Sequence, residues 1–110
     1  MTQVTIELDK NVAEQWNNLV RLFGNQRLLF SDFIEYHKKS IRREIARMQG
    51  DLLRYEDQYE MSSETFYRKF DQGELEDSQD FIVWSGTYEM QQESKNQLEQ
   101  LSWYRAILPR

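Results

Sequence analysis

The sequence of 110 residues contains no cysteine, and it has only one proline, four glycines and one histidine. Without cysteine the chain can form neither disulfides nor thiolate metal sites, which fits a reducing cytoplasm. A single histidine has no second histidine or cysteine with which to complete a metal motif. No apolar run approaches the roughly 18 residues of a membrane span, and the polar N-terminus does not resemble a signal peptide. These absences predict a cytoplasmic protein with no membrane partner.

The chain is instead rich in aromatic residues and uneven in charge. Aromatic side chains make up 14% of the residues, which is enough for a small core in one domain or in a domain with an appended segment. Residues 1–50 carry eight Lys/Arg against six Asp/Glu, whereas residues 51–110 carry six against thirteen. This split favours a basic half that meets phosphates and an acidic half that meets a basic protein, although two solvated faces would give the same counts.

The N-terminal stretch QVTIELD alternates apolar and polar residues, which is the pattern of a half-buried β-strand. Val4, Ile6 and Leu8 would form its apolar side. A lone strand leaves its backbone N–H and C=O groups unpaired, and the rest of the sequence looks helical. A second copy of the chain is the simplest source of a partner strand, so we expect a homodimer.

Two helices are predicted to follow this strand. Asp9 is a suitable N-cap for a helix over 10–23. The next helix begins at Asn25 or at Ser31, and Ser31 is favoured because an acidic residue follows it in the first turn. Gly50 either ends this helix or only weakens it. Its apolar residues are spaced by three and four, nearly as in a heptad seam, and comprise Ile34, His37, Ile41, Ile45, Met48, Leu52, Tyr55 and Tyr59.

Two further helices are predicted in the second half. Ser62 or Ser63 caps a short helix that stops at Gly73. A last helix runs from about 79 to 102, apolar at first and then polar on nearly all sides. The predicted fold is therefore mainly α, with a single N-terminal β-strand that pairs between two chains.

The first half of the chain resembles a ribbon-helix-helix module in two stretches, QVTIELDKNVAEQWNNLVRLFG and FSDFIEYHKKSIRREI. The resemblance implies a two-stranded ribbon that enters the major groove of operator DNA. It implies base contacts from Gln3, Thr5 and Glu7, and a phosphate at the helix N-terminus that Ser31 caps. Glu7 departs from the family, which usually has a donor there, and a carboxylate repels phosphate. A basic helix face in the same half would add phosphate contacts, and it comprises Lys38, Lys39, Arg42, Arg43 and Arg47.

The second half resembles the C-terminal half of small antitoxins that archaea and cyanobacteria encode beside TumE-type toxins. The shared elements are MSSETFYRKF, GELED and DFIVWSGTYEM, but Glu60 and Glu76 stand where the family pattern has glycine. The resemblance implies that this half neutralises a toxin by binding it. Acidic candidates for the contact are Glu74, Glu76, Asp77 and Asp80. Aromatic candidates, of which packing between the helices would bury about half, are Phe66, Tyr67, Phe70, Phe81, Trp84 and Tyr88.

Catalysis is not expected, because the sequence has no cysteine nucleophile, no glycine-rich phosphate loop and no regular calcium-loop spacing. Accordingly we predict no cofactor and no small-molecule substrate. The sequence is best interpreted as an antitoxin that represses transcription of its own operon. Residues 1–50 would form the dimeric DNA-binding module and residues 51–110 the toxin-binding segment. The alternative is a helical dimeric scaffold protein that does not bind DNA.

Overall fold

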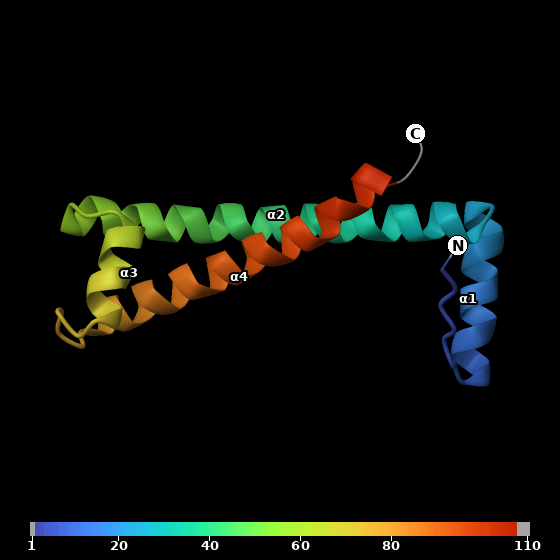
Figure 1. The fold of residues 1–110 in the computed structure, drawn as a ribbon, viewed down its shortest axis with the longest axis horizontal. Helices are drawn as coiled ribbons and strands as arrows, with labels where there is room; N and C mark the ends of the chain where they lie inside the picture. The colour runs from blue at the N-terminus through green and yellow to red at the C-terminus, as the bar shows by residue number, and fades with distance from the viewer. Residues whose placement is uncertain (1, 108–110) are drawn as a thin grey trace. The chain divides into compact units, whose positions relative to one another are not determined.

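The computed structural model describes residues 2–107, with side chains described for 2–102. Figure 1 shows its four helices, which are α1 (Lys10–Phe23), α2 (Gln26–Tyr59), α3 (Ser63–Asp71) and α4 (Gln79–Ile107). The chain divides into two compact units, which we call unit 1 (Met1–Tyr36) and unit 2 (His37–Arg110). The boundary between them lies within α2. The functional division predicted at residue 50 stays a prediction.

The mainly α character is confirmed, but the predicted N-terminal strand is wrong. Residues 2–107 contain no β-strand, and residues 2–9 belong to no helix or strand. Val4, Ile6 and Leu8 are all exposed. Alternation describes where the side chains of an extended segment point, whereas a strand exists only when a neighbouring strand takes its hydrogen bonds. The interchain ribbon-helix-helix fold therefore has no support in the structure.

The boundaries of α1 follow from local capping, and the predicted range 10–23 is confirmed. The Asp9 carboxylate accepts a hydrogen bond of 2.9 Å from the backbone N–H of Val12. At the other end Gly24 adopts a positive φ of 100°, and its N–H donates to the carbonyl of Val20 at 2.9 Å. A residue without a Cβ is favoured in this conformation, so the helix ends there.

The second helix begins at the earlier of its two predicted starts. The side-chain oxygen of Asn25 accepts the backbone N–H of Leu28 at 2.8 Å and so caps α2. Ser31 consequently lies inside α2, and the predicted start at Ser31 is wrong. Gly50 also lies inside α2 and does not interrupt it. One glycine costs a helix only about 1 kcal/mol relative to alanine, too little to break a long helix on its own.

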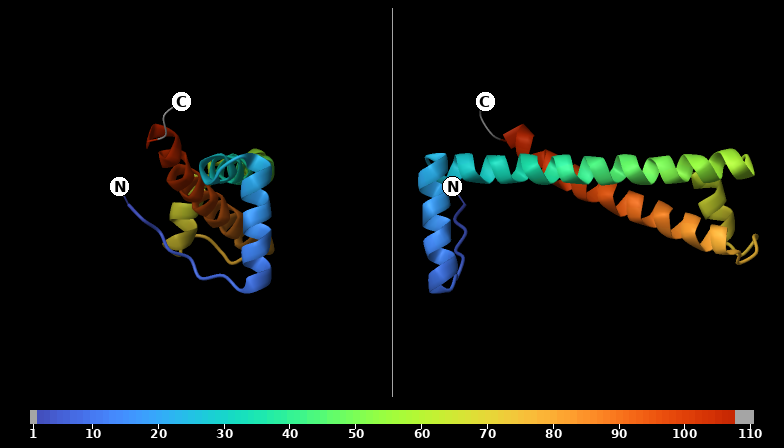
Figure 2. Two further views of the ribbon diagram at one scale, coloured as in Figure 1. Left: turned by 90° about the vertical axis from the view of Figure 1, so that its right-hand side faces the viewer. Right: turned by 180° about the vertical axis from the view of Figure 1, so that it is seen from behind.

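Within unit 2, α4 returns antiparallel to α2, and α3 lies between them at one end (Figures 1 and 2). A stripe of buried and half-buried side chains on α2 follows a heptad spacing here, and it comprises Lys38, Ile41, Ile45, Met48, Leu52, Tyr55 and Tyr59. Lys38, with 2% exposure, occupies the inner position predicted for His37, which is exposed. The matching stripe on α4 comprises Trp84, Thr87, Gln91, Ser94, Leu98 and Leu101. Two heptad stripes give each helix a continuous face for the other.

The core of unit 2 lies where α2, α3 and α4 meet. Its fully buried members are Leu52, Phe66 and Trp84, one from each helix. Phe66 and Trp84 are stacked with ring centroids 3.7 Å apart. Half-buried side chains surround these three and comprise Tyr55, Tyr59, Met61, Tyr67, Phe70, Leu75, Phe81 and Tyr88. This aromatic cluster holds α3 against both longer helices.

Candidate protein-binding site

The loop between α3 and α4 is fixed at both ends by backbone hydrogen bonds. After α3, Gly73 adopts a φ of 76°, its N–H donates to the carbonyl of Phe70, and the N–H of Glu74 donates to Lys69. This pair of bonds is a Schellman motif, which places glycine at the left-handed position. Before α4, the Ser78 hydroxyl accepts the N–H of Phe81 at 3.1 Å. Only four residues lie between Gly73 and Ser78 along the chain, so the loop has little freedom.

Three carboxylates on this loop are exposed to solvent. They belong to Glu74, Glu76 and Asp77, and Leu75 between them is half-buried in the aromatic cluster. The surrounding sequence adds to the negative charge, because residues 51–99 carry thirteen Asp/Glu against four Lys/Arg. A fixed acidic surface of this kind attracts a basic protein and costs little ordering on binding. Three of the four predicted acidic contacts are therefore accessible, whereas Asp80 is half-buried.

The aromatic residues predicted to contact a partner are mostly in the core. Phe66 and Trp84 have 0% exposure, so they can support a binding surface only from beneath. Tyr67, Phe70 and Phe81 are half-buried among them, as is Tyr88. Ring contacts continue from the Phe66–Trp84 stack. Phe70 stacks on Phe66 with ring centroids 5.5 Å apart, and Phe81 is tilted against Phe66 at 5.2 Å. Packing within unit 2 therefore takes up much of this aromatic surface.

Two tyrosine–carboxylate hydrogen bonds tie α4 to the other helices. The hydroxyl of Tyr59 on α2 donates to Asp80 at 2.5 Å, and that of Tyr67 on α3 donates to Glu89 at 2.6 Å. The bond to Glu89, aided by desolvation, raises the pKa of Tyr67 to about 12, because deprotonation would destroy the donor. The bond to Asp80 raises the pKa of Tyr59 for the same reason. These two carboxylates serve the fold, unlike those of the loop.

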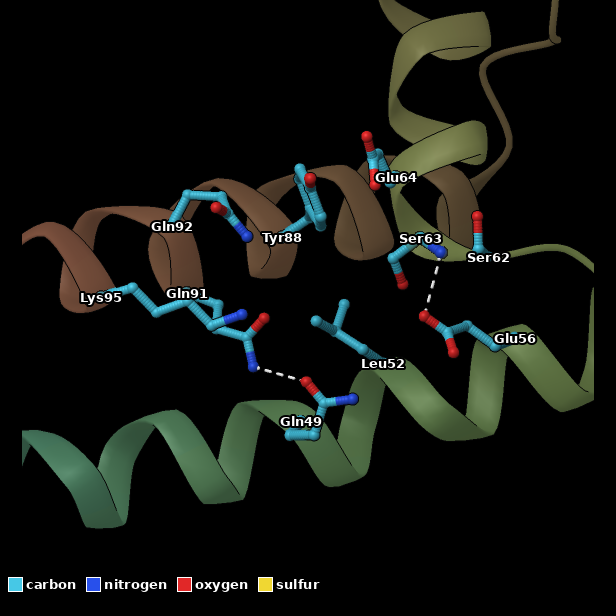
Figure 3. A pocket seen from close by; sticks show the side chains of 10 residues that line it. All are labelled: Gln49, Leu52, Glu56, Ser62, Ser63, Glu64, Tyr88, Gln91, Gln92 and Lys95. Atoms are coloured by element: carbon cyan, nitrogen blue, oxygen red, sulfur yellow. Dashed lines mark hydrogen bonds between the residues drawn. The ribbon is translucent and has the colours of Figure 1, made fainter.

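Figure 3 shows a groove of about 500 Å³ beside the N-terminus of α3, with α2 and α4 as its walls. Four of its polar residues are joined in pairs by hydrogen bonds between the helices. Glu56 accepts the backbone N–H of Ser63 at 2.9 Å. Gln91, with 2% exposure, donates to the side chain of Gln49 at 2.8 Å and to the carbonyl of Ile45 at 3.2 Å. These bonds hold the three helices together, so the groove is a feature of helix packing.

Sequence reasoning missed two exposed apolar residues next to the acidic loop. Ile82 and Val83 are the fourth and fifth residues of α4, and more than two-fifths of each is exposed. The helical period would have found them. Once Trp84 is placed inward, the inner stripe continues at Thr87 and Gln91, which leaves positions 82 and 83 outside it. Apolar side chains beside fixed charges are suitable anchors for a protein partner.

The residues predicted to bind DNA are not brought together by a common element. Gln3, Thr5 and Glu7 are exposed in the irregular segment 2–9. The backbone N–H of Ser31 lies within α2, away from the helix N-terminus where an anion would bind. Lys38 is buried, whereas Arg42 is exposed. Arg42 belongs to an exposed basic stripe of α2, which also includes Lys39, Arg43 and Arg47.

Comparison of the chain with protein-family models, curated proteins and solved structures gives no match. Within the described residues, none of the helices combines the length and apolar character that a bilayer crossing requires.

Proposed function

We propose that this chain is an antitoxin that neutralises a basic toxin protein by binding it through unit 2. The observation that carries the proposal is the short loop that exposes Glu74, Glu76 and Asp77, a few residues before the exposed apolar side chains of Ile82 and Val83. The resemblance of the second half to antitoxin partners of TumE-type toxins points the same way. A basic toxin that handles RNA would present cationic residues for these carboxylates.

Co-purification with the product of the neighbouring gene tests the proposal directly. A small basic protein should elute with this chain at a fixed ratio, and co-expression should relieve its toxicity. If the two proteins elute separately at low salt, the antitoxin proposal is wrong and the scaffold alternative is favoured.

A charge-neutralising variant then tests the surface. Glu74→Gln/Glu76→Gln/Asp77→Asn should weaken toxin binding by about tenfold or more near physiological salt, because three attractive charges are lost. The matched control, Glu14→Gln/Glu93→Gln/Glu99→Gln, removes the same charge from other exposed sites and should bind within about threefold of wild type. Equal weakening by both variants would mean that only net charge matters.

A second function is favoured by the exposed basic stripe of α2, namely binding of operator DNA through phosphate contacts. Only one acidic residue, Glu44, lies among five Lys/Arg over residues 37–47. Base reading by the N-terminal segment depended on the ribbon and is not part of this proposal. Binding to the chain's own promoter should fall steeply with salt, and Arg42→Gln/Arg43→Gln should lower both the affinity and the salt slope. If the variant binds the promoter as tightly as wild type does, the basic stripe is not a DNA-binding surface.

A further inference from the structure

Unit 1 leaves most of its large apolar side chains exposed to solvent. None of the residues of the amphipathic helix α1 is buried. Most of the chain's large exposed hydrophobic residues lie in unit 1, including Val4, Ile6, Leu8, Val12, Leu19, Leu22, Phe23 and Leu28. Exposed apolar side chains that gather on one helix face are typical of an interaction site.

The exposed residues of α1 form a seam suited to another helix. Val12 and Leu19 are seven residues apart, and Leu22 and Phe23 follow at three and four. This is the spacing with which one helix meets another in a coiled-coil contact. Leu22 lies at the edge of the seam and is 81% exposed. The seam occupies nearly the whole of α1.

We infer that this face of α1 is a helical interface with a second copy of the chain. Charge favours a copy over other partners, because α1 carries only Lys10, Glu14 and Arg21 and can meet itself without strong repulsion. A face that selects a basic toxin would be acidic, as residues 51–99 are. A helix that lies on a membrane would be rich in Lys/Arg on its polar side, which α1 is not.

Burial of apolar side chains would favour such a dimer. Val12, Leu19, Leu22 and Phe23 are each between 38% and 81% exposed, so each would lose apolar area to a second copy. This interface differs from the predicted strand ribbon, because helix side chains and not backbone hydrogen bonds form it. It stands independently of toxin binding.

Sedimentation velocity of the full chain tests the inference. Interfaces of modest affinity have dissociation constants in the micromolar range. At a protein concentration of tens of micromolar we therefore expect a species of twice the 13.4 kDa chain mass. Leu19→Lys/Leu22→Lys should weaken association by at least about tenfold, because two charges would be buried in the interface. The control Leu53→Lys places the same charge on a residue of unit 2 that is 53% exposed, and it should remain dimeric.

A further variant separates loss of association from loss of folding. Leu19→Ala/Leu22→Ala removes apolar area while alanine favours the helix, so helix content by circular dichroism should be kept and dimerisation weakened. The inference is overturned if wild type is monomeric at these concentrations, or if the lysine variant dimerises as wild type does. A monomer that sediments with anionic lipid vesicles would show a membrane-binding face instead.

Discussion

The indole N–H of Trp84 donates a buried hydrogen bond of 2.8 Å to the hydroxyl of Ser63, which joins α4 to the first residue of α3. The backbone N–H of Ser63 in turn donates to Glu56 of α2. One small residue thus connects all three helices of unit 2. The stacking of Phe66 on Trp84 fixes the indole ring in the orientation that this bond needs.

Ser63→Ala should destabilise unit 2 by about 1–3 kcal/mol, because the buried indole N–H would lose its acceptor. Urea unfolding followed by circular dichroism measures the change. The control is Ser85→Ala, since the Ser85 hydroxyl bonds only the carbonyl of Ile82 in its own helix, and it should change stability by less than about 0.5 kcal/mol. Equal effects would show that the Trp84 bond contributes little.

Gly50→Ala should stabilise the chain by about 0.5–1 kcal/mol. Gly50 lies inside α2, and a Cβ there would meet nothing within 4 Å, so alanine gains helix propensity without a clash. Gly73→Ala should have the opposite effect. A Cβ at Gly73 would also meet nothing within 4 Å, but the backbone φ of 76° there disfavours alanine. The substitution should cost about 1 kcal/mol. Thermal unfolding should therefore move to higher temperature for one variant and to lower temperature for the other.

Glu60→Gly should also stabilise the chain, by about 1 kcal/mol. Glu60 directly follows the last residue of α2 and has a φ of 51°. The backbone N–H of the next residue, Met61, donates to the carbonyl of Glu56 at 3.3 Å. A glycine adopts this left-handed conformation without strain. Glu76→Gly is the control, because Glu76 has a negative φ and glycine there would only add freedom to the unfolded chain. Stabilisation by both variants would point to charge and not to backbone conformation.

Stability should fall as pH rises from 10 toward 12. The folded-state pKa of Tyr67 is raised from 10.0 to about 12, so its contribution is complete below pH 10 and is lost as pH approaches 12. Tyr59 adds a contribution of the same sign. Tyr67→Phe should flatten the decline in unfolding free energy over this range. Phenolate absorbance should show a lower Tyr67 pKa in Glu89→Gln but not in Glu93→Gln.

Local signals in the sequence predicted most helix boundaries. Asp9, Gly24, Ser62 and Gly73 each stand where the helix they bound begins or ends, because a cap needs only its nearest neighbours. The start of α2 was missed because Asn25 and Ser31 are both competent caps. Sequence alone does not rank them when the residues between them can also be helical.

The errors arose where a distant partner decides the outcome. Val4, Ile6 and Leu8 have the alternation of a strand, but pairing depends on a second strand that the described part of the chain does not provide. Lys38, and not the predicted His37, lies on the inner stripe of α2. Position 38 fits the heptad spacing of the stripe, and the long alkyl part of a lysine side chain tolerates burial. The exposure of Ile82 and Val83 followed from the inward position of Trp84, which composition does not reveal.

The fixed loop between α3 and α4 has a kinetic consequence. Since hydrogen bonds at Gly73 and Ser78 already hold both ends of the loop, no slow ordering of its backbone should precede encounter with a basic partner. Added salt should therefore slow association strongly and change dissociation much less. The lifetime of the complex would then depend on the apolar contacts of Ile82 and Val83, and its speed of formation on the carboxylates.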